Sequence, residues 1–158
     1  MSTVADSPDT TVADAQAIAE QSAAAMWAED AASRGLGMQL DEVRPGCAQV
    51  SMQVREDMVN GHAICHGGFV FALADSAFAF ACNSYNRSAV AQACDIVFVA
   101  PARLGDQLVA QAVERTRFGR NGIYDVTVRR DSEVIAEFRG RSREITGLLV
   151  PEDAESPS

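Results

Sequence analysis

Residues 67–82 constrain the fold of this chain more than any other segment. Every side chain in this stretch is small or apolar except those of Asp75 and Ser76. Ala, Leu and Phe dominate, and this composition favours a helix over a strand. A helix that is apolar on all its faces is surrounded by protein. We therefore expect a long central helix with the rest of the chain packed around it.

The segments on either side of this helix carry the alternation that is typical of strands. Residues 39–54 predict two strands joined near Pro45 and Gly46, and residues 60–66 predict a loop. Turn residues at 118–122 and 131–132 separate further alternating segments. We expect four strands here, arranged as a meander, at residues 89–99, 107–116, 123–129 and 134–145.

An alanine-rich stretch at residues 13–32 predicts an additional amphipathic helix, with Ile18 and Trp27 among its apolar side chains and Gly35 and Gly37 ending it. Residues 1–12 are expected to be a flexible N-terminus, and residues 148–158 a flexible acidic tail. The sequence thus predicts one α+β domain over residues 13–147. In this domain an antiparallel β-sheet wraps around one long central helix, with an extra N-terminal helix.

The charge pattern limits the class of partner. The chain of 158 residues has a net charge of −9, and its positive side chains gather between residues 103 and 143 without forming a basic block. Such a chain is repelled by phosphate backbones, so no nucleic acid is expected as a partner. No signal-peptide pattern and no run of eighteen apolar residues occur, so we expect a cytoplasmic protein with no membrane partner. The four cysteines are expected to be reduced, buried thiols.

Asp75 is the residue that most needs a chemical explanation. Burying a lone carboxylate costs several kcal/mol unless it is paired, hydrogen-bonded or protonated. The neighbours one turn away offer no counter-charge: Phe71, Ala72, Phe78 and Ala79. Carboxylates in such surroundings are functional-site candidates. The alternative is that Asp75 pairs with an arginine or a backbone amide elsewhere in the fold.

Gly67 and Gly68 open the same helix and supply a second candidate element. The first amides of a helix are unpaired donors at the positive end of its dipole. Because glycine has no side chain, a ligand can approach these amides closely, and they could hold a carbonyl oxygen on which negative charge develops. The alternative is that the two glycines only form a tight turn into the helix.

The spacing between Gly67 and Asp75 has a geometric consequence. Asp75 lies eight residues beyond Gly67, which is about 12 Å along a helix. A carbonyl held by the Gly67 amide cannot also be attacked from Asp75 of the same helix. If both groups act on one substrate, they come from different subunits. We therefore expect a two-fold interface with antiparallel central helices and two sites per dimer.

The loop before the helix carries further polar candidates. His62, Cys65 and His66 could be interpreted as a metal cluster, but a tetrahedral site needs further ligands, so neither a metal nor a cofactor is expected. His66 is expected to fix the helix entrance and to contact a substrate carbonyl. Asn60 could orient a water or the Asp75 carboxylate, or could simply be a turn residue. No Gly-x-Ser-x-Gly elbow is present, which argues against a serine triad.

The run Asn-Gly-His-Ala-Ile-Cys-His-Gly-Gly at residues 60–68, with residues 71–84, closely resembles the PaaI-type hotdog thioesterases of phenylacetate degradation. The His-Gly-Gly element is shared across many hotdog thioesterases, whereas residues 73–84 are more specific to the PaaI type. The resemblance covers roughly residues 15–147 and continues through residues 94–96, 101–103, 105–106, 122–126 and 138–140.

This resemblance implies a hotdog fold, commonly a homotetramer built as a dimer of dimers. It also implies hydrolysis of phenylacetyl-CoA or its hydroxylated relatives to the free acid and CoA. Asp75 then corresponds to the catalytic carboxylate, as general base or nucleophile. Gly67 corresponds to the oxyanion-hole amide, and Asn60 and His66 correspond to the assisting polar groups. Some related enzymes place a serine or threonine near the start of the next strand, where this chain offers only Gln92.

Substrate contacts are expected from several further residues. The Gly68 amide lies beside the oxyanion-hole candidate, and positive charge alone suggests four arginines for the CoA phosphates: Arg103, Arg115, Arg117 and Arg120. Four phenylalanines fit an aromatic acyl pocket and equally fit the core: Phe69, Phe71, Phe78 and Phe80. Two alternative functions stay open on the fold alone, a non-catalytic acyl-CoA-binding hotdog module and a hotdog dehydratase.

Overall fold

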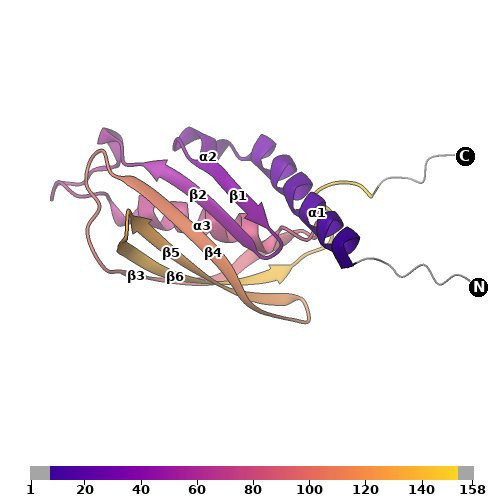
Figure 1. Cartoon of the computed structure of the whole chain (residues 1–158). Helices are drawn as coiled ribbons and strands as arrows, with labels where there is room; N and C mark the ends of the chain where they lie inside the picture. Colours follow the sequence, from indigo (N-terminus) through magenta and orange to yellow (C-terminus); the bar gives the residue numbers. More distant parts are fainter. Residues whose placement is uncertain (1–7, 153–158) are drawn as a thin grey trace, which may run out of the picture.

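The computed structural model describes residues 8–152 and confirms the expected α+β architecture. Figure 1 shows an antiparallel sheet that curves around the central helix α3. In chain order the elements are α1 (Pro8–Glu29), α2 (Ala31–Gly35), β1 (Gln39–Arg44), β2 (Cys47–Gln53), a 3₁₀ turn (Glu56–Met58), α3 (Gly67–Cys82), β3 (Ala89–Phe98), β4 (Gln107–Phe118), β5 (Asn121–Arg130) and β6 (Glu133–Glu144).

The central helix α3 has the bounds that its composition predicts, and half of its residues are buried against the sheet. The ring of Phe78 packs against Tyr124 and Phe138, with centroids 5.6 and 5.9 Å away. Gly140 of β6 makes this contact possible, because a Cβ at that position would lie 2.8 Å from the Phe78 ring. A glycine in the strand therefore lets the helix approach the sheet closely.

The order of strands corrects one expectation. The six strands of the described chain are arranged β1-β2-β4-β5-β6-β3. Strands β4, β5 and β6 form a meander, whereas β3 is not hydrogen-bonded to β4, the strand that follows it in the chain. Instead β3 pairs with β6 at the edge of the sheet, with Ile96 opposite Phe138. The expected four-strand meander was wrong at β3, because alternation along a strand identifies the strand but not its neighbour in the sheet.

The N-terminal helix also differs in detail from its expectation. It begins at Pro8, before the expected start at Ala13, and a break at Asp30 separates it from α2. Trp27 packs against Phe80 of α3, with centroids 6.0 Å apart. Ile18 is 43% exposed, however, and the buried stripe of α1 consists of small side chains: Ala19, Ser22 and Ala23. Figure 1 shows α1 lying beside β1.

The C-terminal segment returns to the end of α3. The Asn86 side chain accepts hydrogen bonds from the amides of Leu149 and Val150, at 3.0 and 2.8 Å. These two residues of the expected flexible tail are therefore held against the domain. The rest of that tail from residue 153, and residues 1–7 of the expected flexible N-terminus, lie outside the described residues.

All four cysteines are free thiols. Cys65 and Cys82 are buried as expected, whereas Cys47 and Cys94 are only partly buried. Within residues 8–152, no helix is long and apolar enough to span a membrane.

Candidate active site

Asp75 is partly buried on α3, and its carboxylate forms no hydrogen bond or ion pair with any of the residues that the structure describes. Burial raises the pKa of its carboxyl group above the ordinary value of 3.8. The alternative of a structural ion pair with an arginine is therefore not seen within the described chain. A lone carboxylate with a perturbed pKa marks a functional-site candidate on physical grounds.

Asp75 lies on the side of α3 that faces the edge strand β3. Burial raises the pKa of the Cys94 thiol of β3, and the negative charge of Asp75 raises it further. The same charge also acts on the thiol of Cys82, about two turns further along α3. Sequence reasoning missed Cys94 as a group near Asp75, because their proximity depends on the position of β3 in the sheet.

At the start of α3, the amides of the two glycines differ. The Gly68 amide donates to Nδ1 of His66 at 2.9 Å, and the Phe69 amide donates to the His66 carbonyl at 3.0 Å. The Gly67 amide has no hydrogen-bond partner among residues 8–152. Of the two expected donors, only the Gly67 amide is therefore available for an oxyanion.

His66 is the N-cap of α3, and the cap fixes its tautomer. Because Nδ1 accepts a hydrogen bond from the Gly68 amide, the ring proton resides on Nε2. The exposed imidazole thus presents an N–H donor next to the Gly67 amide. His66 thus fixes the helix entrance as expected, and its contact with a substrate carbonyl stays a prediction.

Asn60 organises the loop that leads to the helix. Its Oδ1 accepts from the His62 amide at 2.9 Å, which is the turn role considered for this residue. Its Nδ2 group makes no hydrogen bond with the described residues and stays available as a donor. The end of the loop is fixed where the Cys65 amide donates to the Ala102 carbonyl at 2.7 Å.

Phe98, at the end of β3, lies against the helix start. A Cβ built on Gly67 would lie 2.9 Å from Cζ of the Phe98 ring. Along β3, Cys94, Ile96 and Phe98 share one face of the strand, since side chains alternate along it. Cys94 lies near Asp75 and Phe98 touches Gly67, so this row of side chains runs from one candidate group to the other. Sequence reasoning missed Phe98, because it lies 31 positions beyond Gly67 in the chain.

Gln92 lies at the opposite end of β3 from Phe98. It is the extra residue of a β-bulge, between Ala91 opposite Ser142 and Ala93 opposite Arg141. Its side chain is exposed. Within one subunit, the structure does not bring Gln92 to the Gly67 amide.

The four candidate arginines do not form one cluster. Arg117 lies 3.7 Å over the Tyr85 ring, beyond the C-terminal end of α3. The side chain of Arg120 donates to the Glu144 carbonyl at 3.1 Å. Arg103 follows Ala102, which contacts the loop before α3, and its guanidinium forms no ion pair or hydrogen bond among the described residues.

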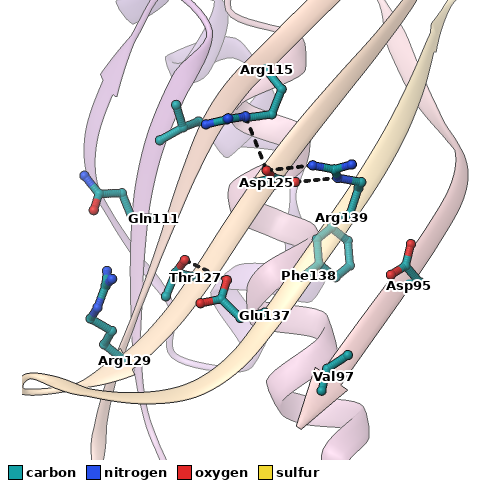
Figure 2. Close-up of a pocket in the computed structure, with 11 residues that line it drawn as sticks. Asp95, Val97, Gln111, Arg115, Asp125, Thr127, Arg129, Glu137, Phe138 and Arg139 are labelled. Atoms are coloured by element: carbon teal, nitrogen blue, oxygen red, sulfur yellow. Dashed lines mark hydrogen bonds and ion pairs between the residues drawn. The ribbon is translucent and has the colours of Figure 1, made fainter. Parts of the chain in front are cut away.

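The fourth arginine, Arg115, lines a depression of about 560 Å³ on the outer face of the sheet. Figure 2 shows Arg115 and Arg139 reaching the same carboxylate, that of Asp125, at 3.4 and 2.6 Å. The hydrogen bond from Arg139 lowers the pKa of Asp125. The lining of the depression does not include Asp75, so it is not the candidate active site.

The four candidate pocket phenylalanines separate into core and surface. Phe78 and Phe80 are each 1% exposed and belong to the core. Phe71 packs against Phe138, with centroids 5.3 Å apart. Phe69 is partly buried and meets the His66 ring edge-on at 6.1 Å. Of these four side chains, only Phe69 lies at the start of the helix.

Several known proteins are similar in sequence to this chain. Residues 62–137 match the model of the family described as the thioesterase superfamily. The acyl-coenzyme A thioesterase PaaI of Escherichia coli (strain K12) is 44% identical over 133 residues, which is 84% of this chain and 95% of that protein. A putative esterase of Deinococcus radiodurans is 40% identical over 66% of this chain and 73% of its own length.

A solved structure shares the fold of this chain. The structure of the E. coli PaaI protein from the phenylacetic acid degradation operon superposes with a TM-score of 0.82 at 42% identity, covering 84% of this chain and 97% of that chain.

Proposed function

This chain belongs to the thioesterase superfamily as a PaaI-type hotdog acyl-CoA thioesterase, and on that premise we propose that it hydrolyses phenylacetyl-CoA or its hydroxylated relatives, with Asp75 as the catalytic carboxylate. One observation carries the proposal: Asp75 is partly buried, has a raised pKa and has no partner among the described residues. The phenylacetyl group is suggested by the operon of the E. coli relative.

Two subunits are needed to assemble the site. Gly67 and Asp75 lie about 12 Å apart along α3, so a single thioester carbonyl cannot reach both groups of one chain. The edge strand β3 offers the surface for a second copy. Within residues 8–152 it pairs only with β6, and its exposed apolar side chains include Val97 and Phe98, at 61% and 53% exposure. An open strand edge with apolar side chains favours pairing with another chain.

The backbone of β3 suggests the register of that pairing. The Val99 amide donates to the Ile135 carbonyl of the adjoining strand. Since backbone groups alternate in direction, those of Ile96 and Phe98 face the open edge. A two-fold axis at Ile96 would put Phe98 opposite Cys94 of the partner subunit. Because Cys94 lies beside Asp75, and Phe98 touches Gly67, this register brings the partner subunit's Asp75 to the Gly67 amide.

The chemistry follows from the groups that meet there. The thioester oxygen accepts a hydrogen bond from the Gly67 amide, with His66 Nε2 and Asn60 Nδ2 as additional donors. The Asp75 carboxylate either takes a proton from an attacking water or attacks the carbonyl carbon itself. In the first route a C–O bond to water forms, the C–S bond breaks, and the proton taken up by Asp75 passes to the departing sulfur of CoA. In the second route Asp75 forms a mixed anhydride as the C–S bond breaks and CoA leaves as a thiolate. Water then hydrolyses the anhydride to the free acid, and the proton left on Asp75 passes to the CoA thiolate, which regenerates the carboxylate. Dimers of this kind, paired again, would give the expected tetramer.

The CoA phosphates require a cation within reach of the thioester. Among the four candidates, Arg103 is the best placed, because it follows the contact that fixes the loop before α3 and its guanidinium is unpaired within the described residues. The other three already contact Asp125, Tyr85 or Glu144. In the two-fold register, Gln92 would also approach the partner subunit's helix start and could orient a water there.

Release of free CoA thiol, measured with a thiol reagent, tests the proposed function. We expect thiol release from phenylacetyl-CoA and hydroxyphenylacetyl-CoA at higher kcat/KM than from aliphatic esters. A non-catalytic binding module would bind these esters without releasing thiol. A dehydratase would remove water from a 3-hydroxyacyl thioester and leave the thioester intact. Either of these results would overturn the proposal.

Subunit complementation tests the shared site. Asp75→Asn and Gly67→Val homodimers should both be inactive. When equal amounts of the two variants are unfolded, mixed and refolded, random assortment makes half of the dimers heterodimers. Each heterodimer contains one intact site, formed by Gly67 of the first variant and Asp75 of the second. We therefore expect the mixture to regain about one quarter of the wild-type rate. No recovery, in a mixture whose mixed dimers are verified by differential tagging, would show that Gly67 and Asp75 do not act across an interface.

A further inference from the structure

We propose that the ring of Phe98 forms one wall of the acyl pocket and selects flat aryl groups over flexible alkyl chains. The inference rests on the proposed function and deepens it, because it assigns selectivity to a residue outside the motif around α3. Its starting point is the contact between Phe98 and Gly67, whose amide is unpartnered among the described residues.

The contact with Gly67 involves the tip of the Phe98 ring. The three ring atoms nearest to a Cβ built on Gly67 are Cζ, Cε1 and Cε2, at 2.9, 3.2 and 3.4 Å. These atoms form the tip of the ring, so Phe98 points at the helix start instead of lying flat on it. The side chain is 53% exposed in the single chain. An acyl group whose carbonyl oxygen sits on the Gly67 amide would therefore lie beside a ring face.

The other phenylalanines near α3 cannot fill this role. Phe78 and Phe80 are core side chains, and Phe71 is packed against Phe138. Phe69 stands edge-on to the His66 ring. Phe98 combines contact with the helix start and an exposed aromatic surface.

A row of side chains on β3 would line the proposed pocket. Cys94, Ile96 and Phe98 share one face of the strand, and in the two-fold register Phe98 lies opposite Cys94 of the partner subunit. The ring would then line one side of the space between the Gly67 amide and the partner subunit's Asp75, where the thioester carbonyl lies. A flat aryl group can stack on it in an offset arrangement, whereas an alkyl chain of equal size cannot. The stacking preference of aromatic pairs corresponds to about a 2- to 12-fold difference in kcat/KM.

The test compares two esters of similar acyl size, phenylacetyl-CoA and hexanoyl-CoA, in the full-length dimer. We expect Phe98→Leu to lower the ratio of kcat/KM for the aryl ester over the alkyl ester by about 2- to 12-fold. Phe98→Tyr keeps the ring and should keep the ratio. Phe118→Leu is the matched control, because Phe118 is similarly exposed, at 55%, and lies at the end of β4. This control should leave the ratio unchanged.

The outcomes separate this inference from the proposed function. An unchanged ratio in Phe98→Leu, or an equal loss for both esters, would overturn the role of Phe98 while leaving the thioesterase proposal intact. If Phe98→Leu does not form the wild-type oligomer by sedimentation, Phe98→Met provides the same comparison with a larger flexible side chain. A wild-type protein that releases no thiol from any ester would defeat the proposed function and this inference together.

Discussion

Ser76, the residue after Asp75, is hydrogen-bonded to Ser33 of α2 at 2.9 Å. Ser33 is itself held by Asp30, because its hydroxyl donates to Asp30 Oδ2 at 2.6 Å. Since that bond uses the hydroxyl hydrogen of Ser33, Ser76 is the donor in the bond between the two serines. The bond ties one side of α3 to α2, while Asp75 faces β3 on another side. Ser76 therefore helps to fix the rotation of α3 that orients Asp75.

Removal of this bond should lower stability modestly. Ser76→Ala should lower the free energy of unfolding by about 0.5–1.5 kcal/mol, because one partly buried hydrogen bond is lost. Urea denaturation measures the change. Ser132→Ala, in the exposed turn between β5 and β6, is the control and should stay within about 0.5 kcal/mol of the wild type. Equal stability of Ser76→Ala and the wild type would show that the hydrogen bond between Ser76 and Ser33 does not stabilise the fold.

Asp75→Asn should lower kcat by about 10²- to 10⁴-fold, because the amide can neither accept a proton nor act as a nucleophile. The variant should still fold and bind acyl-CoA. Steady-state thiol release and equilibrium binding measure the two effects. Asp95→Asn is the control, because Asp95 is an exposed carboxylate on the other face of β3 and should keep most of the activity. An Asp75→Asn enzyme with near wild-type turnover would exclude Asp75 as the catalytic carboxylate.

The raised pKa of Asp75 also predicts how stability depends on pH. Burial raises the pKa of the folded carboxyl group above 3.8, so between that value and the raised one the folded state binds more protons than the unfolded state. The contribution of Asp75 to stability therefore falls as the pH rises through this window. Asp75→Asn removes the cost of burying the charge and should be more stable than the wild type at pH 7.

Chemical denaturation between pH 4 and pH 7 measures whether the contribution of Asp75 to stability falls as the pH rises. The stability difference between Asp75→Asn and the wild type should shrink as the pH approaches 4, and the acid limb of the wild-type kcat/KM profile should lie above 3.8. A variant less stable than the wild type at pH 7 would show instead that the carboxylate is stabilised by a contact outside the single chain.

Gly140→Ala should lower the free energy of unfolding by about 1–3 kcal/mol. The new Cβ would lie 2.8 Å from the Phe78 ring, which is fully enclosed between α3 and the sheet and cannot move aside. Thermal and urea unfolding measure the loss. Gly61→Ala is the control, because nothing lies within 4 Å of a Cβ at that position. Similar stabilities for the two variants would be inconsistent with close packing at Gly140.

Arg103→Ala should raise KM for acyl-CoA roughly tenfold with little change in kcat, because a contact to a CoA phosphate acts on binding and not on the reacting carbonyl. The effect should weaken as ionic strength rises. Arg44→Ala, which removes an exposed arginine paired with Glu42 on β1, should leave KM unchanged. Equal KM values for Arg103→Ala and the wild type would remove Arg103 from the CoA site.

The sequence by itself determined the elements whose signals are local. Residues 67–82 are apolar on every side, so the bounds of α3 could be predicted without knowledge of its neighbours. The hairpin of β1 and β2 and the meander of β4, β5 and β6 follow from alternation and turn residues. His66, Gly67 and Asp75 became candidates because they lie within one contiguous motif on a single helix.

Only the tertiary structure decided which distant residues meet these candidates. The edge position of β3 places Cys94 near Asp75 and the tip of the Phe98 ring against Gly67. At the start of α3, the His66 side chain accepts the hydrogen bond of the Gly68 amide and leaves the Gly67 amide without a partner among the described residues. The ion pair between Arg115 and Asp125 likewise depends on the pairing of two strands, β4 and β5. Periodicity along a strand records which side chains face the core, but it carries no information about the neighbouring strand. That choice is made by packing between residues far apart in the chain.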